Sequence, residues 1–433
     1  MSSARNTPLD AAVALGIRVA SAGLVFGLQV LLARLMPGEA YGGFVTLWTW
    51  MLALGSFAAL GFAESSVRFL PRYHLRGRRA ALRGYWRFGF ATVLGVSLLA
   101  ALAAGGLALG LGGTGVWLTV LLVALGLPFL AIEYYLEGVA RSFGWFRLAA
   151  VPVYIVRPIL IGAAALGLAA AGVELTLPLV GAVLVGAMAV VAAALAVAVA
   201  RRLARIAPER AATGARQRRL WLAASLPLLL LSGLEDLTSY ADVLLLSLLA
   251  EPGQVGIYFA AARSLALAGF VAYAMTLVSG RRFALDLAGR SRDELQASIL
   301  EATRLTFWAT LVAVAATLLA GPLLLGAFGA EFLAGQAVMW VLGLGMVVRA
   351  MAGQAGEALI VTGRQREGVA IGLATLAVVA GLCLVLVPAF GPLGAAVASA
   401  LAMACRTVAL IAVLRRVAGL RVFSLGLPKL RAA

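Results

Sequence analysis

Residues 178–200 read PLVGAVLVGAMAVVAAALAVAVA, and residues 201–219, which follow directly, read RRLARIAPERAATGARQRR. The first segment is apolar throughout and has the length of about 20 residues that an α-helix needs to cross a bilayer. It shows none of the polar–apolar alternation of a membrane β-strand. Because lipid offers no hydrogen-bond partners, this segment predicts a helix, which pairs its own backbone groups.

The whole chain of 433 residues is strongly apolar, with 63% hydrophobic and 12% charged residues. A soluble domain has roughly half apolar and roughly a quarter charged residues, so this chain has too little polar surface to cover itself in water. The sequence therefore predicts an all-α polytopic membrane protein with about 12 transmembrane helices. The predicted spans lie at residues 11–35, 42–63, 88–110, 116–135, 150–171, 178–200, 220–249, 257–280, 305–327, 334–362, 369–387 and 393–414.

Positive charge alternates from one connection to the next. Of the 35 Lys and Arg residues, 29 lie in one set of alternate connections and at the two ends of the chain. Positive loops stay on the side from which a protein is inserted, so this side is predicted to be cytoplasmic, together with both termini. The opposite connections contain no Lys or Arg, and they are residues 36–41, 111–115, 172–177, 250–256, 328–333 and 388–392.

The charge and the reactive side chains exclude several functions. The net charge of +17 comes from arginines that border spans and face anionic lipid headgroups, so a nucleic-acid partner is not expected. Cys383 and Cys405 lie in apolar runs and His74 lies in a basic loop, which leaves no catalytic or metal site. The sequence lacks a P-loop and any large soluble loop, so we expect a secondary transporter and no enzyme.

Weak internal similarity divides the chain into two pseudo-symmetric six-helix halves around a central cavity. Pro37-Gly38 and Pro252-Gly253 begin corresponding turns, and Pro178-Leu179-Val180-Gly181 corresponds to Pro392-Leu393-Gly394-Ala395. Parallel repeats of this kind support alternating access. The predicted parts are an N-terminal half at 1–200, a basic linker at 201–219, a C-terminal half at 220–414 and a basic tail at 415–433.

Several short stretches carry a family resemblance. They are Leu32–Gly42 (LARLMPGEAYG), Asp242–Leu245, Val255–Tyr258, Thr362–Arg364 and Gly394–Ala398. Together they resemble the lipid-linked oligosaccharide flippases of the MOP exporter superfamily, which have a MATE-like fold.

This resemblance implies that the protein flips an undecaprenyl-diphosphate-linked oligosaccharide, an O-antigen or exopolysaccharide unit, outward across a bacterial inner membrane. It also implies membrane lipids and other polysaccharide-assembly membrane proteins as partners.

Arginines inside spans are the predicted substrate-binding residues. Each costs about 2.5–3.5 kcal/mol near the bilayer centre unless it meets water, a partner or a ligand. A guanidinium donates two parallel hydrogen bonds to a phosphate, which fits a diphosphate cargo. The six are Arg18, Arg34, Arg157, Arg263, Arg349 and Arg406, although Arg34 can also snorkel to the exterior.

Carboxylates in the later spans are the predicted coupling residues for Na+ or H+. Ser232, Glu235, Ser239 and Asp242 recur at helical spacing and form one polar stripe, with Asp236 beside it. Glu357 is a further candidate. Two structural alternatives stay open, because the stripe can hold helices together and Asp242 can pair with Arg263 across a hairpin.

A third carboxylate group has a different expected role. Glu133, Glu137 and Arg141 follow i, i+4 spacing at a cytoplasmic end, which is typical of a solvated helix face.

Two other functions compete with the flippase. A MATE-like cation or drug antiporter should show carboxylates and aromatic residues with few cavity cations. A non-transporting scaffold of a polysaccharide-export complex would use the polar stripe only for packing.

Overall fold

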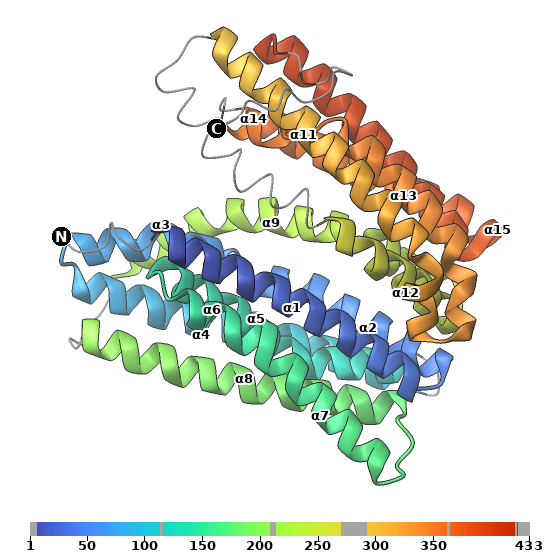
Figure 1. Cartoon of the computed structure of the whole chain (residues 1–433). Helices are drawn as coiled ribbons and strands as arrows, with labels where there is room; N and C mark the ends of the chain where they lie inside the picture. Colours follow the sequence, from blue (N-terminus) through green and yellow to red (C-terminus); the bar gives the residue numbers. More distant parts are fainter. Residues whose placement is uncertain are drawn as a thin grey trace. The chain divides into compact units, whose positions relative to one another are not determined.

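The computed structural model describes residues 7–112, 116–207, 214–269, 292–361, 364–420 and 422. All regular secondary structure within these residues is helical (Figure 1). This confirms the predicted all-α class. The order of the elements is α1 (Thr7–Leu35), α2 (Gly38–Ala58), α3 (Phe62–Leu75), α4 (Arg79–Gly110), α5 (Trp117–Ser142), α6 (Phe146–Val151), the π-helical turn η1 (Pro152–Val156), α7 (Arg157–Ala170), α8 (Leu177–Ile206), α9 (Ala215–Leu249), helical residues 252–269, α11 (Arg292–Leu319), α12 (Gly321–Phe328), the 3-10 turn η2 (Ala330–Gly335), α13 (Gln336–Ala350), α14 (Ala355–Val361), α15 (Gln365–Val413) and the π-helical turn η3 (Leu414–Ala418).

Long apolar helices make this a multi-pass membrane protein. Within the described residues, eight helices are long and apolar enough to cross a membrane, or nine if α2 and α3, bent by 42°, form one span. Helix α15 covers the predicted span 369–387 and nearly all of the span 393–414. The chain kinks between them at Gly391 (φ 55°), which lies between Pro388 and Pro392. The predicted span 257–280 lies partly outside the described residues.

The chain divides into two compact units, Met1–Asp236 and Leu237–Ala433, and the division falls inside α9. The division predicted at the 201–219 linker, with its two halves and tail, stays a prediction. In the first unit, α5 lies at the centre and packs against α2, α3, α4 and α8.

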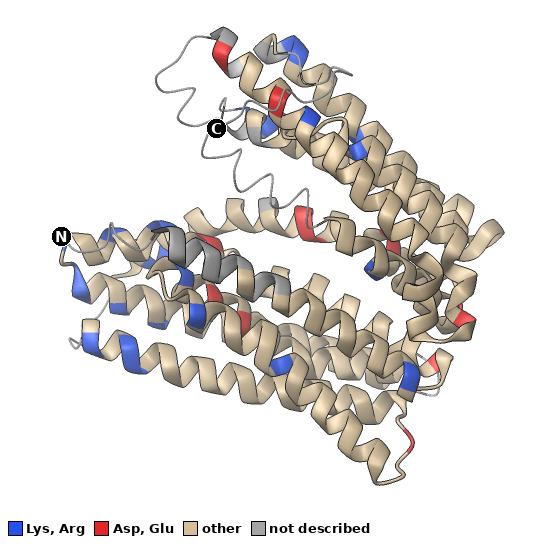
Figure 2. Cartoon of the chain, in the orientation of Figure 1, with Lys and Arg blue, Asp and Glu red and all other residues tan. Residues whose placement is uncertain are grey.

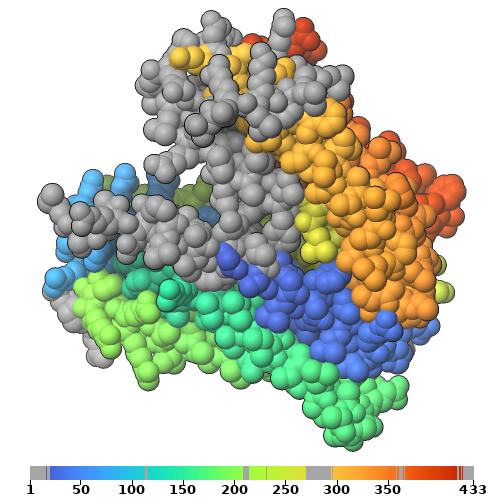
Figure 3. All heavy atoms as spheres, viewed as in Figure 1, coloured from blue at the N-terminus to red at the C-terminus, as the bar shows by residue number. Residues whose placement is uncertain are grey.

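One face of the first unit is built for contact with lipid. Helices α1, α7 and α8 lie side by side there, and they form one surface in the space-filling view (Figure 3). Large apolar side chains on α7 and α8 are half or more exposed on the isolated protein, among them Ile159, Leu166 and Val190. A surface this apolar is stable in hydrocarbon and not in water.

Hydroxyl groups and aromatic rings attach the first part of α9 to the first unit. The hydroxyl of Ser65 lies 2.6 Å from that of Tyr85 and 2.7 Å from that of Ser225, and all three residues are buried. The indole N–H of Trp221 donates to the Tyr73 hydroxyl at 2.9 Å. Such bonds join helices where lipid provides no competing partner.

The basic connections of the first unit lie together at one end (Figure 2). Arg83, near the start of α4, donates from Nη1 to the carbonyl of Ala207 after α8, at 2.8 Å. The guanidinium of Arg202 lies 5.1 Å from the centre of the Trp145 ring, between α5 and α6. Contacts between these loops therefore place the arginine-rich segments on the same side, as the sequence pattern requires.

We predict that Gly138→Ala destabilises the first unit by about 1–3 kcal/mol, the usual effect of overpacking. A Cβ at Gly138 of α5 would overlap the backbone carbonyl of Ala63 in α3. Thermal unfolding in detergent measures the effect. Gly167→Ala is the matched control, because a Cβ there meets open space. Equal stability of the two variants would contradict the close α3–α5 packing.

Candidate functional site

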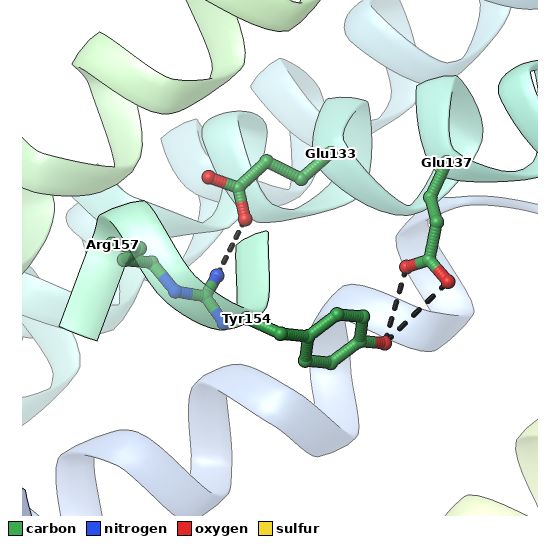
Figure 4. A network of polar contacts seen from close by, with 4 residues as sticks. All are labelled: Glu133, Glu137, Tyr154 and Arg157. Atoms are coloured by element: carbon green, nitrogen blue, oxygen red, sulfur yellow. Dashed lines mark hydrogen bonds and ion pairs between the residues drawn. The ribbon is translucent and has the colours of Figure 1, made fainter. Parts of the chain in front are cut away.

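A break in the fifth predicted span positions two polar side chains. Helices α6 and α7 are joined by η1, in which the N–H of Arg157 donates to the carbonyl of Pro152 in the π pattern. Pro152 and Pro158 lack backbone N–H groups, so the helix here loses hydrogen bonds and deviates from α geometry. Tyr154 and Arg157 extend from this break toward α5 (Figure 4).

Arg157 forms a buried ion pair. Its Nη1 donates to Oε2 of Glu133 on α5 at 2.5 Å, and the two residues are 6% and 1% exposed. Its guanidinium also lies 5.1 Å from the centre of the Trp48 ring on α2. An ion pair with an aromatic neighbour stabilises a guanidinium away from water.

A second set of contacts lies one helical turn closer to the basic end. The Tyr154 hydroxyl donates to Oε2 of Glu137 at 3.2 Å, and Nε of Arg141 lies 3.8 Å from Oε1 of Glu137. Glu137 is buried, whereas the side chain of Arg141 is 46% exposed. Arg141, Glu137 and Tyr154 thus form a series of polar side chains that runs from the basic end into the bundle.

The interpretation of Glu133 and Glu137 as a solvated helix face is wrong. Both are buried: Arg157 pairs with Glu133, and the Tyr154 hydroxyl donates to Glu137. Spacing within one helix does not reveal what a second helix covers. The available signal was Arg157 between two prolines, a cation inside a span that requires a carboxylate partner nearby.

The other predicted arginines lie in different places. Arg34 is exposed near the end of α1, and the guanidinium of Arg263 lies 4.7 Å from the centre of the Phe259 ring. Arg349 is exposed at the C-terminal end of α13, where a cation complements the helix dipole. Arg406 lies on α15, which packs against α13. Arg18 belongs to α1, but its side chain lies outside the described residues.

The predicted coupling carboxylates are also separated. Glu235 is exposed and Asp236 is partly buried within the first unit. Asp242, in the second unit, accepts hydrogen bonds from the hydroxyls of Tyr258 at 2.5 Å and Ser399 at 3.2 Å. Both bonds go to Oδ2, and the backbone N–H of Val243 donates to Oδ1 at 2.8 Å. Glu357 lies in α14 and its side chain is outside the described residues.

The residues that the structure brings together are therefore few. In the first unit Arg157 forms an ion pair with Glu133, and in the second unit Arg349 and Arg406 lie on the packed helices α13 and α15. Within the described residues, no group of three or more His, Cys, Asp or Glu side chains could hold a metal ion.

The first unit is thus a helical bundle with an ion pair buried between its helices. The fold is similar to "Lipid II flippase MurJ, inward closed conformation", with 13% identity, coverage of 93% of this chain and 87% of that chain, and a TM-score of 0.72. It is also similar to an inward-facing multidrug resistance MATE family transporter of the MOP superfamily, with 14% identity, coverage of 92% and 94%, and a TM-score of 0.69. A MOP superfamily transporter from Pyrococcus furiosus Vc1, titled for the reverse polarity of its binding pocket, matches with 14% identity, coverage of 95% and 94%, and a TM-score of 0.58.

The family model described as "Polysaccharide biosynthesis protein" matches residues 10–279, and the chain belongs to this family. No curated protein sequence matches the chain. The family and the similar structures are those of flippases and transporters and not of enzymes, which confirms the resemblance found in the sequence.

We predict that Glu133→Ala lowers the free energy of unfolding by about 3–5 kcal/mol, because it leaves the buried Arg157 without its partner. Denaturation of the purified protein in detergent measures the loss. Glu174→Ala removes an exposed loop carboxylate and should leave stability unchanged. If both variants unfold like the parent, the Glu133–Arg157 pair does not support the bundle.

Proposed function

We propose that the protein is a flippase for a polyprenyl-diphosphate-linked oligosaccharide, carried outward across a bacterial inner membrane by alternating access. One observation carries this proposal, namely that guanidinium groups lie inside spans in both compact units. Arg157 is buried in the first unit, and Arg349 and Arg406 lie on the packed helices α13 and α15 of the second. Family membership and the transporter fold support the same conclusion.

The Arg349 and Arg406 pair suits an anion with more than one charge. Two guanidiniums close together repel each other, and an anion bound by both removes the repulsion. A diphosphate offers several oxygens to the two planar forks. The sugar chain needs a hydrated route, while the polyprenyl tail stays in lipid.

The direction of transport follows from the charge pattern. We assign the basic end of the first unit to the cytoplasm, where its arginines contact anionic lipid headgroups. Both termini then lie in the cytoplasm, on the side where lipid-linked sugar units are assembled. Other polysaccharide-assembly membrane proteins are proposed partners there.

Coupling to Na+ or H+ is assigned to the carboxylates of the spans, Glu235, Asp236, Asp242 and Glu357. Asp242 is favoured, because Tyr258 and Ser399 place hydroxyl oxygens from two other helices beside its carboxylate. Oxygen ligands from several helices are suited to a small cation. Binding of the cation would therefore link the positions of these helices.

A MATE-like cation antiporter is the second candidate. The fold similarity to MATE transporters and the carboxylates Asp236 and Asp242 favour it. A scaffold without transport is the third, in which the same groups only hold helices together.

We predict that Arg349→Ala and Arg157→Ala each lower flipping of a diphosphate-linked lipid by about tenfold or more, since a charge-assisted hydrogen bond contributes about 1.5–3 kcal/mol. Proteoliposomes with a labelled polyprenyl-diphosphate sugar measure the rate. Arg157→Lys is the companion variant, because it keeps a cation for Glu133 and loses the planar fork.

Arg147→Ala, at an exposed position of the basic end, is the control and should flip normally. Unchanged flipping in the Arg349 and Arg157 variants would reject the cationic cargo site. Drug efflux that persists in them would favour the antiporter, and an effect on complex assembly alone would favour the scaffold.

A further inference from the structure

Glu133 has one carboxylate oxygen that the first unit does not satisfy. Oε2 accepts the hydrogen bond from Arg157, whereas Oε1 is buried and has no hydrogen-bond partner in the described part of the chain. Buried polar atoms in proteins are nearly always paired, so an oxygen left in this state needs an explanation. A proton on Oε1 supplies one, because a neutral carboxyl group costs much less to bury without a hydrogen bond than a carboxylate does.

The charged groups around Glu133 fit the uptake of one proton. Arg157 acts on it from α7 and Glu137 acts on it from one turn along α5. Tyr154 of η1 and Trp48 of α2 complete the surroundings without adding charge. Glu137 has its own cationic partner in Arg141, so a proton on Glu133 neutralises the carboxylate that faces Arg157.

A line of polar groups leads from the basic end to within one helical turn of Glu133. Arg141 is half exposed at the basic end, Glu137 contacts it, and Tyr154 donates its hydroxyl hydrogen to Glu137. Glu133 lies one helical turn further inside the bundle (Figure 4). A proton that enters from the basic end can reach Glu133 through these groups.

We propose that Glu133 is a proton-binding site that controls whether Arg157 is available to an anion. A proton from water adds to Oε1, the carboxyl group becomes neutral, and the ion pair to Nη1 of Arg157 is lost. Arg157 keeps its charge and binds a phosphate oxygen in place of the carboxylate. When the anion leaves, Glu133 releases its proton and recaptures Arg157. The anion step rests on the proposed function, whereas the proton step does not.

Infrared difference spectroscopy of the full-length protein in lipid tests the proton step. A pH titration should show a carboxyl band of protonated Glu133 that is absent in Glu133→Gln and unchanged in Glu174→Gln, a loop variant. Trp48 emission should change with the same midpoint as Arg157 leaves the ring, and Trp48→Phe identifies that signal. The proposal is overturned if the carboxyl band persists in Glu133→Gln, or if Trp48 emission does not change with pH.

Glu133→Asp provides a second test of the proton step in case Glu133→Gln folds poorly. The shorter side chain moves the carboxylate away from Arg157, so the midpoint of the titration must shift. An unchanged midpoint shows that the titrating group is not Glu133.

Binding of inorganic pyrophosphate to the same protein tests the anion step. The affinity of the parent protein for pyrophosphate should rise severalfold as pH falls, and this rise should disappear in Glu133→Gln. Pyrophosphate itself titrates equally in both measurements, so the comparison of the two proteins isolates the contribution of Glu133. The same pH dependence in both proteins overturns the inference and leaves the proposed function intact. A Glu133 titration without any pyrophosphate binding overturns the proposed function and leaves the proton site intact.

Discussion

The ion pair between Arg157 and Glu133 is the constraint on which the first unit depends. A guanidinium among lipid-embedded helices has no water to solvate it, so a carboxylate on a neighbouring helix must compensate its charge. The two partners fix α7 against α5, and α5 contacts most of the other helices of this unit. The π-turned segment between two prolines is what points Arg157 and Tyr154 at that central helix.

The same constraint links structure to transport. In the proposed function Arg157 also binds the anionic cargo. It must then exchange the carboxylate of Glu133 for a phosphate group. The polar groups between Glu133 and the basic end provide that exchange with a proton route, and the Arg349–Arg406 pair of the second unit offers a place for charge on the cargo. Positive loops lie together at one end of the first unit, which we assign to the cytoplasmic side.

Composition and loop charge were sufficient to predict an all-helical multi-pass protein. Long apolar segments in lipid must pair their own backbone groups, and an α-helix does this within one segment. They also located the kink near Gly391, which separates two predicted spans within α15. Side-chain partners were harder to predict. Asp242 was a candidate from its own helix, but Ser399 lies 157 residues further along the chain. Glu133 was misjudged, since its burial depends on a helix break that periodicity does not reveal.

The proposed transport requires that Arg349 faces a water-accessible chamber, and cysteine accessibility tests this most directly. Cys383 and Cys405 are first replaced by Ala, and Arg349→Cys is then exposed to a membrane-impermeant charged thiol reagent in native membranes. Arg147→Cys, at the basic end, reports access from that side of the bilayer. The account predicts that Cys at position 349 reacts and that pyrophosphate slows the reaction. A thiol that stays inert while position 147 is modified would contradict it.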